Sequence, residues 1–241
     1  MIAARAGMRL AAGGIAAGLA VQAGPALSSL TVVRRRWPTL AGIGAAGQVA
    51  LTFDDGPDPV GTPRFLEMLA ERQVHATFFV LGRMLAASPS LGLEITAAGH
   101  ELAVHGWDHR NLLLRGPRAT RDDIARTRDL IGNLTGNAPL WWRPPYGVLS
   151  GAGLLAAARL SLQPVLWTAW GRDWEARATQ RSVLATARRD LSGGGTLLLH
   201  DSDCTSAPGS WRTTLAALPD VLDLCDAHGW QVVPVREHLP R

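Results

Sequence analysis

The chain has 241 residues and a formal net charge of +4, and 47% of its residues are hydrophobic. This length and composition suit one large α/β domain with a sizeable core. The excess positive charge lies near the N-terminus, where the first 46 residues hold no acidic residue and five arginines: Arg5, Arg9, Arg34, Arg35 and Arg36. The rest of the chain is nearly neutral, which excludes a basic surface for nucleic acid.

Residues 1–46 are expected to direct the chain out of the cytoplasm. Met1–Arg9 is a short basic segment, and Leu10–Val33 is an uncharged run rich in Ala and Gly. These features resemble a secretory signal peptide with a candidate cleavage site at Val21-Gln22-Ala23, and the run is also long enough for an uncleaved membrane anchor. We therefore expect a protein that is secreted or anchored to the outer face of the cell membrane, with its functional domain at residues 47–241.

Strand-like and helix-like segments alternate through this domain. Short apolar or β-branched runs predict strands at residues 48–53, 76–81, 101–104, 140–143, 164–169, 196–199 and 231–235. Helices are predicted at residues 63–73, 89–98, 119–135, 150–160, 182–191 and 211–228. A series of strand–helix units of this length implies a parallel sheet that tends to close. We predict a single α/β domain with a distorted (β/α)7-type barrel.

Two adjacent carboxylates, Asp54 and Asp55, follow the first predicted strand in the stretch Thr52-Phe53-Asp54-Asp55-Gly56-Pro57. Gly and Pro end the strand and force a turn. One carboxylate of such a pair can bind a metal ion while its neighbour stays free as a base. The alternative is a turn whose carboxylates only accept hydrogen bonds from the local backbone.

Further polar residues fall where other predicted strands end. They are His105 and His109 after the third strand, Arg143 at the end of the fourth, Asp173 after the fifth and His200 at the end of the sixth. In a parallel barrel all these positions share the carboxyl-terminal rim, where active sites are built. One turn of helix would bring His105 and His109 to the same side. With Asp55 they form a set of three ligands that leaves coordination positions open for catalysis.

The motifs resemble those of the polysaccharide deacetylases, which form carbohydrate esterase family four and share the NodB homology domain. They are Thr52 to Pro57, His105 to His109, Arg143-Pro144-Pro145-Tyr146, Asp173-Trp174 and Leu198-Leu199-His200, in this order along residues 47–241. Two positions depart from the family pattern. Gly106 stands where the family commonly has Ser or Thr, and Trp170 stands where an acidic residue often precedes Asp173.

The resemblance implies a role for each matching residue around a metal site. Asp55, His105 and His109 match the ligands of a divalent metal ion, which in the family is usually Zn²⁺. Asp54 matches the catalytic base, and Arg143 matches the residue that holds the carboxylate of the base. This set implies that a water molecule is deprotonated as it attacks an acetyl carbonyl.

The remaining matches lie on the side of the substrate and the leaving group. His200 matches the general acid, and Asp173 matches the carboxylate that stabilises its imidazolium. The backbone amide of Tyr146 matches an oxyanion contact. Trp174 and Leu198 match walls of the acetyl groove, although both could equally be ordinary core residues.

We therefore expect a monomeric hydrolase that removes N-acetyl groups from amino-sugar polymers of the peptidoglycan or chitin type. One alternative is an O-acetyl esterase acting on xylan, which would use the same metal and base. Another is a catalytically silent glycan-binding module at the cell surface. The complete set of base, acid and ligands argues against the binding module, which has no need of all three.

Two cysteines, Cys204 and Cys225, fit a protein that is exported. In an oxidising compartment they could form a disulfide between a loop and a late helix. The alternative is two unpaired thiols.

Overall fold

The structure is a computed structural model that describes residues 18–34 and 36–240. The predicted basic segment Met1–Arg9 and the first part of the uncharged run lie outside these residues. Within the described ranges, no helix combines the length and the apolar character needed to cross a bilayer.

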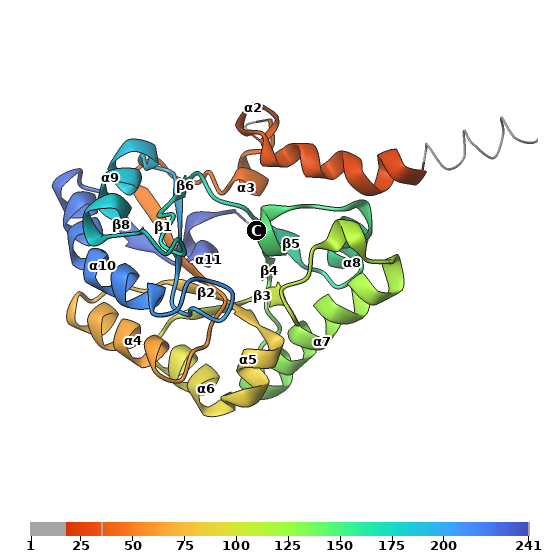
Figure 1. The fold of residues 1–241 in the computed structure, drawn as a ribbon, viewed down its shortest axis with the longest axis horizontal. Coiled ribbons are helices and arrows are strands. Elements are labelled where there is room, and N and C mark those ends of the chain that lie inside the picture. The colour runs from red at the N-terminus through yellow and green to blue at the C-terminus, as the bar shows by residue number, and fades with distance from the viewer. Residues whose placement is uncertain (1–17, 35, 241) are drawn as a thin grey trace, which may run out of the picture.

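The strands form one parallel sheet that curls into a half-barrel (Figure 1). They are β1 (Gln48–Asp54), β2 (Thr77–Leu81), β3 (Glu101–Gly106), β4 (Trp141–Trp142), β5 (Gln163–Pro164), β6 (Ala169–Trp170), β7 (Thr196–His200) and β8 (Gln231–Val233). Their order is β5-β4-β3-β2-β1-β7-β6, and β8 pairs with the first residues of β1. The predicted (β/α)7-type fold in a single domain is confirmed.

Helices form the outer layer around this sheet. They are α4 (Gly61–Glu71), α5 (Gly82–Ala87), α6 (Pro89–Ala97), α7 (Pro117–Thr135), α8 (Gly151–Arg159), α9 (Gln180–Asp190), α10 (Ser210–Ala227) and α11 (Val235–His238). The six predicted helices are all present near their predicted bounds, because their start and stop signals are local. For example, α7 begins with Pro117 and ends before Gly136, whose φ of 72° is left-handed. The sequence analysis missed α5 and α11, which are too short to show a helical repeat.

The strand β1 lies at the centre of the structure, since it pairs with both β2 and β7. Its Phe53 is fully buried and contacts Phe65 of α4 and Phe78 of β2, with ring centroids 5.0 and 5.1 Å away. A second, smaller group of buried apolar residues includes Phe79 and Trp141. Apolar packing on β1 thus fixes the strand whose end carries Asp54.

The prediction of one continuous strand at residues 164–169 is wrong. The structure has two short strands there, β5 and β6, and residues 165–168 cross between the two edges of the sheet without a helix. Val165 and Leu166 are fully buried in this crossing, so the segment has the apolar composition of a buried strand. The amide of Leu166 donates to the carbonyl of Leu40, at 2.8 Å, in the short helix α3 (Pro38–Ala41).

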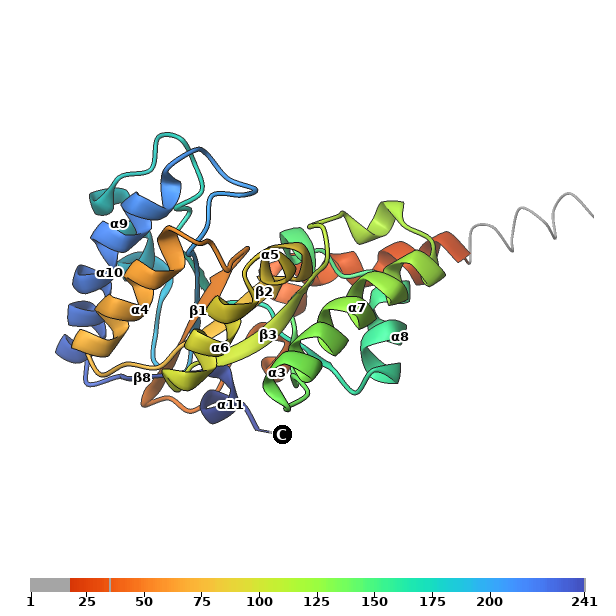
Figure 2. The ribbon, with the colours of Figure 1, turned by 90° about the horizontal axis from the view of Figure 1, so that it is seen from below.

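Residues 18–34 and 36–41, here called the N-terminal arm, run beside α8 on the side of the domain away from α9 and α10 (Figures 1 and 2). They include η1 (Gly24–Ser29) and α2 (Thr31–Arg34). The side chain of Gln22 joins this arm to the domain. Its Nε2 donates to the carbonyl of Leu112 at 3.2 Å, and its Oε1 accepts from the amide of Ala152, at 3.1 Å, in the first turn of α8.

Candidate active site

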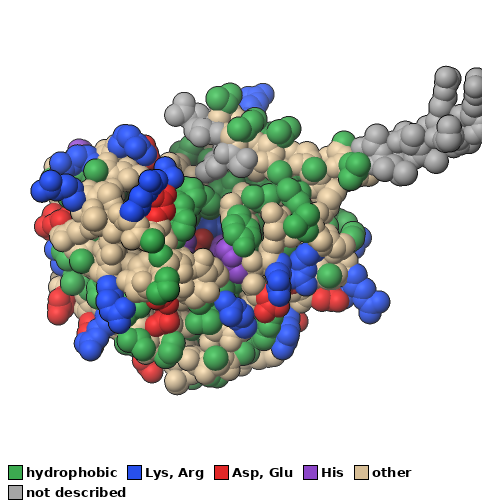
Figure 3. All heavy atoms as spheres, in the orientation of Figure 1, with side chains coloured by type: hydrophobic (Ala, Val, Ile, Leu, Met, Phe, Trp, Pro, Cys, Tyr) green, Lys and Arg blue, Asp and Glu red, His purple; other side chains and the backbone are tan. Residues whose placement is uncertain are grey.

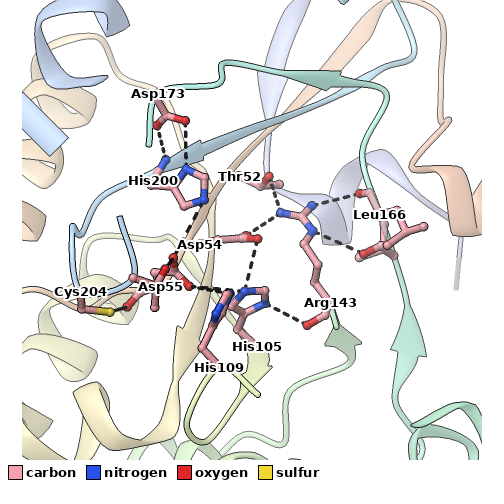
Figure 4. A network of polar contacts seen from close by, with 12 residues as sticks. Thr52, Asp54, Asp55, His105, His109, Arg143, Leu166, Asp173, His200 and Cys204 are labelled. Atoms are coloured by element: carbon pink, nitrogen blue, oxygen red, sulfur yellow. Dashed lines mark hydrogen bonds and ion pairs between the residues drawn. The ribbon is translucent and has the colours of Figure 1, made fainter. Parts of the chain in front are cut away.

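Five strands deliver the predicted polar residues to one end of the half-barrel, as Figure 4 shows for the network around Asp54 and Asp55. A cleft of about 250 Å³ opens there, and Figure 3 shows histidine side chains inside a hollow of the surface. The predicted residues that line this cleft are Asp54, Asp55, His105, His109, Tyr146, Trp174, Leu198 and His200. Arg143 and Asp173 lie fully buried, each in contact with a residue that lines the cleft.

Asp55, His105 and His109 bring three ligand atoms within 4.8 Å of one another. Asp55 Oδ1 lies 3.4 Å from His105 Nε2 and 3.5 Å from His109 Nε2. This oxygen is buried and has no hydrogen-bond partner among the described residues. A buried carboxylate oxygen without a partner is costly unless a cation faces it, so the three residues fit a divalent metal ion.

The imidazole of His105 is oriented by the backbone. Its Nδ1 lies 2.9 Å from the carbonyl oxygen of Arg143, which can only accept a hydrogen bond. Nδ1 therefore carries the proton, and the lone pair of Nε2 faces Asp55. Burial lowers the pKa of His105 to about 3 and also lowers the pKa of His109. Both imidazoles are accordingly neutral near pH 7, as metal ligands must be.

The expectation that a helical turn brings the two histidines together is wrong. Gly106 ends β3 with a φ of 108°, and His109 lies in a loop with a φ of 57°. Asp123 of α7 draws this loop inward, since its Oδ2 accepts from the amide of Trp107 at 2.9 Å. A Cβ atom at position 106 would lie 2.9 Å from the same oxygen. The glycine thus permits both the backbone conformation and the close approach of Asp123.

Asp54 is paired with a buried guanidinium. Arg143 Nη1 donates to Asp54 Oδ1 at 2.7 Å and to Thr52 Oγ1 at 2.9 Å, and its Nη2 donates to the carbonyl of Leu166 at 3.1 Å. Burial raises the pKa of the Asp54 carboxyl, and the positive charge of Arg143 opposes that rise. Asp54 is thus held by a cation at Oδ1, while its Oδ2 lies 3.7 Å from His105 Nε2.

His200 and Asp173 form a second buried pair. His200 Nδ1 lies 2.9 Å from Asp173 Oδ1, and the amide of His200 donates to Asp173 Oδ2 at 2.7 Å. Thr214 of α10 also donates to Asp173 Oδ2, at 2.7 Å. Burial lowers the pKa of His200, but the nearby carboxylates, led by Asp173, outweigh burial and raise it to about 9. His200 is therefore a cation at neutral pH, with its Nε2 turned toward the site.

The sequence analysis assigned no role in the site to three residues that contact it. Thr205, in the loop between β7 and α10, donates to Asp55 Oδ2. Trp167 and Trp170 line the cleft, and Trp170 stacks on Trp174 with ring centroids 4.0 Å apart. The tryptophan spacing could have indicated an aromatic wall. No spacing rule could have found Thr205, because loop geometry alone brings it to Asp55.

A larger cleft, of about 760 Å³, lies between the N-terminal arm and the domain. Its lining is almost wholly apolar, and Arg36 is its one ionisable side chain among the described residues. Size therefore does not identify the reactive site here, and the smaller cleft holds the groups that can do chemistry.

The structure has both cysteines as free thiols. Cys225 is buried in α10, whereas Cys204 lies in the loop after β7. Cys204 Sγ donates to the carbonyl oxygen of Asp55 at 3.4 Å. The alternative of two unpaired thiols therefore describes this structure.

The fold and the site together define a metal-dependent hydrolase. Residues 42–165 match the family model described as polysaccharide deacetylase. The chain is also 34% identical over 217 residues to a chitooligosaccharide deacetylase from Bradyrhizobium sp. (strain ANU 289), covering 86% of this chain and 95% of that protein. The chain belongs to the polysaccharide deacetylase family, as its motifs predict.

Two further relatives extend this similarity to peptidoglycan enzymes. The chain is 32% identical over 193 residues to the peptidoglycan-N-acetylglucosamine deacetylase PgdA of Listeria monocytogenes, which covers 79% of this chain but 38% of the length of PgdA. Among solved structures, the Bc1960 peptidoglycan N-acetylglucosamine deacetylase superimposes with a TM-score of 0.76 and 28% identity. This superposition covers 83% of this chain and 92% of that chain.

Replacing Asp173 should lower the pKa of His200. In Asp173→Asn, burial remains while the closest carboxylate is lost, so the pKa should fall well below 9. In the unaltered protein, the stability that this pair contributes is fully present below the ordinary pKa of 6.5 and is lost as the pH rises through about 9. An NMR titration of the imidazole in metal-free protein measures the change. Asp129→Asn, at an exposed ion pair, is the control, and an unchanged His200 pKa in Asp173→Asn would contradict this assignment.

Proposed function

We propose that this protein is an N-deacetylase that removes acetyl groups from N-acetylated sugars in polymers such as peptidoglycan or chitin-like chains. One observation carries this proposal: Asp54 and His200 each lie next to one of the three candidate ligands. Asp54 Oδ2 is 3.7 Å from His105 Nε2, and His200 Nε2 is 4.0 Å from Asp55 Oδ2. A base and an acid next to an ion are what hydrolysis of an amide requires.

In this proposal Asp55, His105 and His109 hold the ion. Two imidazoles and one carboxylate are a donor set that suits Zn²⁺, which is therefore the metal we propose. When bound, the ion would polarise the acetyl carbonyl and lower the pKa of a water molecule. The wall formed by Trp174 and Leu198 would confine the acetyl methyl group beside it.

Asp54 then acts as the base. Its carboxylate takes a proton from the water that attacks the acetyl carbon. Arg143 serves this step because its guanidinium opposes the effect of burial on the Asp54 pKa and fixes the orientation of the carboxylate. Tyr146, whose backbone is held at a φ of 61°, lines the same cleft, and we assign its amide to the developing oxyanion.

His200 acts as the acid. The leaving group of an amide is an amine, and its nitrogen must gain a proton before the carbon–nitrogen bond can break easily. The imidazolium of His200 donates this proton from Nε2, while Asp173 accepts from Nδ1 and stabilises the cation. An ester releases an alcohol, which needs this proton less. The position of His200 next to the candidate ligands, with Asp173 at its Nδ1, thus supports an amide substrate over the xylan ester. The complete acid–base pair disfavours a silent binding module.

We further propose that the protein works as a monomer outside the cytoplasm, held at the outer face of the membrane by an uncleaved N-terminal segment. The basic segment Met1–Arg9, followed by an uncharged run, supports a location outside the cytoplasm. The hydrogen bonds of Gln22 to Leu112 and Ala152 support retention, because cleavage after Ala23 would remove them. Exposed apolar side chains on the N-terminal arm, such as Leu19, add surface for the lipid interface.

Substitutions should distinguish the role of Asp54 as the base from that of Asp55 as a metal ligand. We expect Asp54→Asn to lose at least about 100-fold in acetate release from N-acetyl chito-oligosaccharides while it keeps its metal. Asp55→Asn should lose both activity and metal. Acetate assays with elemental analysis measure both properties, and a chelator should abolish turnover of the unaltered protein. Loss of metal in Asp54→Asn together with retention in Asp55→Asn would mean that the two roles are reversed.

The acid should matter more for amides than for esters. We expect His200→Ala to abolish acetate release from an N-acetylated oligosaccharide and to spare much of the hydrolysis of an activated acetyl ester, because only the amine needs the proton. The ratio of the two kcat/KM values relative to unaltered protein measures this difference. Equal losses on both substrates would contradict the assignment of His200 as the acid.

Retention of the N-terminal segment can be measured directly. Full-length protein expressed with its own N-terminus should fractionate with membranes, and mass spectrometry should recover peptides that contain Gln22. A mature chain beginning at Gly24 in the soluble fraction would refute the anchored form and leave the deacetylase proposal intact.

A further inference from the structure

Each polar atom of the Asp55 residue except one has a partner. Its amide donates to the carbonyl of Phe79 at 3.2 Å, its carbonyl oxygen accepts from Cys204 Sγ at 3.4 Å, and its Oδ2 accepts from the hydroxyl of Thr205. Oδ1 alone is buried without a hydrogen bond, and it faces the two imidazoles. The two oxygens of one carboxylate are thus placed in different environments.

The loop that supplies Cys204 and Thr205 is itself held at several points. Asp201, at its start, accepts a hydrogen bond from the hydroxyl of Thr62 in α4. The amide of Ala207 donates to the carbonyl of Trp174 at 3.1 Å, and Asp203 Oδ2 accepts from the amide of Gly209 at 2.5 Å. These contacts fix the path of the backbone around Thr205. Its hydroxyl is therefore positioned before any ligand or substrate arrives.

We propose that Thr205 is a positioning residue that determines which oxygen of Asp55 faces the metal. Its hydroxyl occupies Oδ2 and fixes the rotation of the carboxylate, so that only Oδ1 points to His105 and His109. Hydrogen bonds to a ligating carboxylate commonly strengthen metal binding by such orientation. This inference rests on the proposed metal site, and it adds a residue that lies outside the five family motifs.

The test is the affinity of metal-free protein for Zn²⁺, measured by titration against a competing chelator. Thr205→Val keeps the shape of the side chain but removes the hydroxyl, and it should weaken Zn²⁺ binding by about 10-fold to 100-fold. Thr205→Ser keeps the hydroxyl and should bind nearly as well as the unaltered protein. Thr205 itself is exposed, so Thr205→Val should still fold, and circular dichroism of the metal-free protein checks this.

Ser206→Ala is the matched control, since Ser206 lines the same cleft next to Thr205. It should bind Zn²⁺ like the unaltered protein. The visible spectrum of the Co²⁺-loaded protein gives a second reading. In Thr205→Val the bands should weaken, because a freed Oδ2 can join the ion and raise its coordination number.

Two outcomes separate this inference from the proposed function. If Thr205→Val binds Zn²⁺ as tightly as the unaltered protein, and its Co²⁺ spectrum is unchanged, the positioning role is overturned while the deacetylase proposal stands. If the unaltered protein binds neither ion, the metal site itself is overturned, and both proposals fail together.

Discussion

The site depends on the burial of one arginine. The side chain of Arg143 binds Asp54, Thr52 and the carbonyl of Leu166, and its own carbonyl oxygen accepts from the imidazole of His105. One residue therefore orients both the proposed base and a proposed ligand. A buried guanidinium is costly unless its donors are satisfied, and here they find a carboxylate, a hydroxyl and backbone carbonyls. A lysine could not make this planar set of contacts.

Two buried histidines of the cleft, His105 and His200, have opposite protonation states. Burial removes the proton from His105, whose lone pair is then free for a cation. At His200 the same burial is outweighed by carboxylates, so that imidazole keeps its proton. The chemistry we propose needs this contrast, because a metal ligand must donate a lone pair and a general acid must donate a proton. The contact with Asp173 makes His200 the proposed acid, whereas His105, which lacks that contact, is a proposed metal ligand.

Much of the fold could be predicted because its signals are local. The Asp-Gly-Pro turn after β1 and the terminal proline and glycine of α7 each specify nearby backbone. The parallel direction of the strands follows from their alternation with helices. The tertiary details could not be predicted in this way. His109 reaches Asp55 through a loop with a left-handed residue, and Thr205 reaches it through contacts distant in sequence. The connection from β5 to β6, which contains no helix, could not be predicted because a buried loop and a buried strand share an apolar composition.

The crossing between β5 and β6 leaves one flank of the half-barrel without a covering helix. Residues of the N-terminal arm fill that flank, where Leu40 bonds to Leu166 and lines an apolar cleft together with Leu149. The N-terminal arm is therefore part of the wall of the domain. A shortened recombinant protein starting at residue 42, where the family match begins, would lack the apolar arm residues that line this cleft, and the loss would favour aggregation. A recombinant protein that keeps the N-terminal arm is therefore expected to be more soluble than one cut to the bounds of the family match.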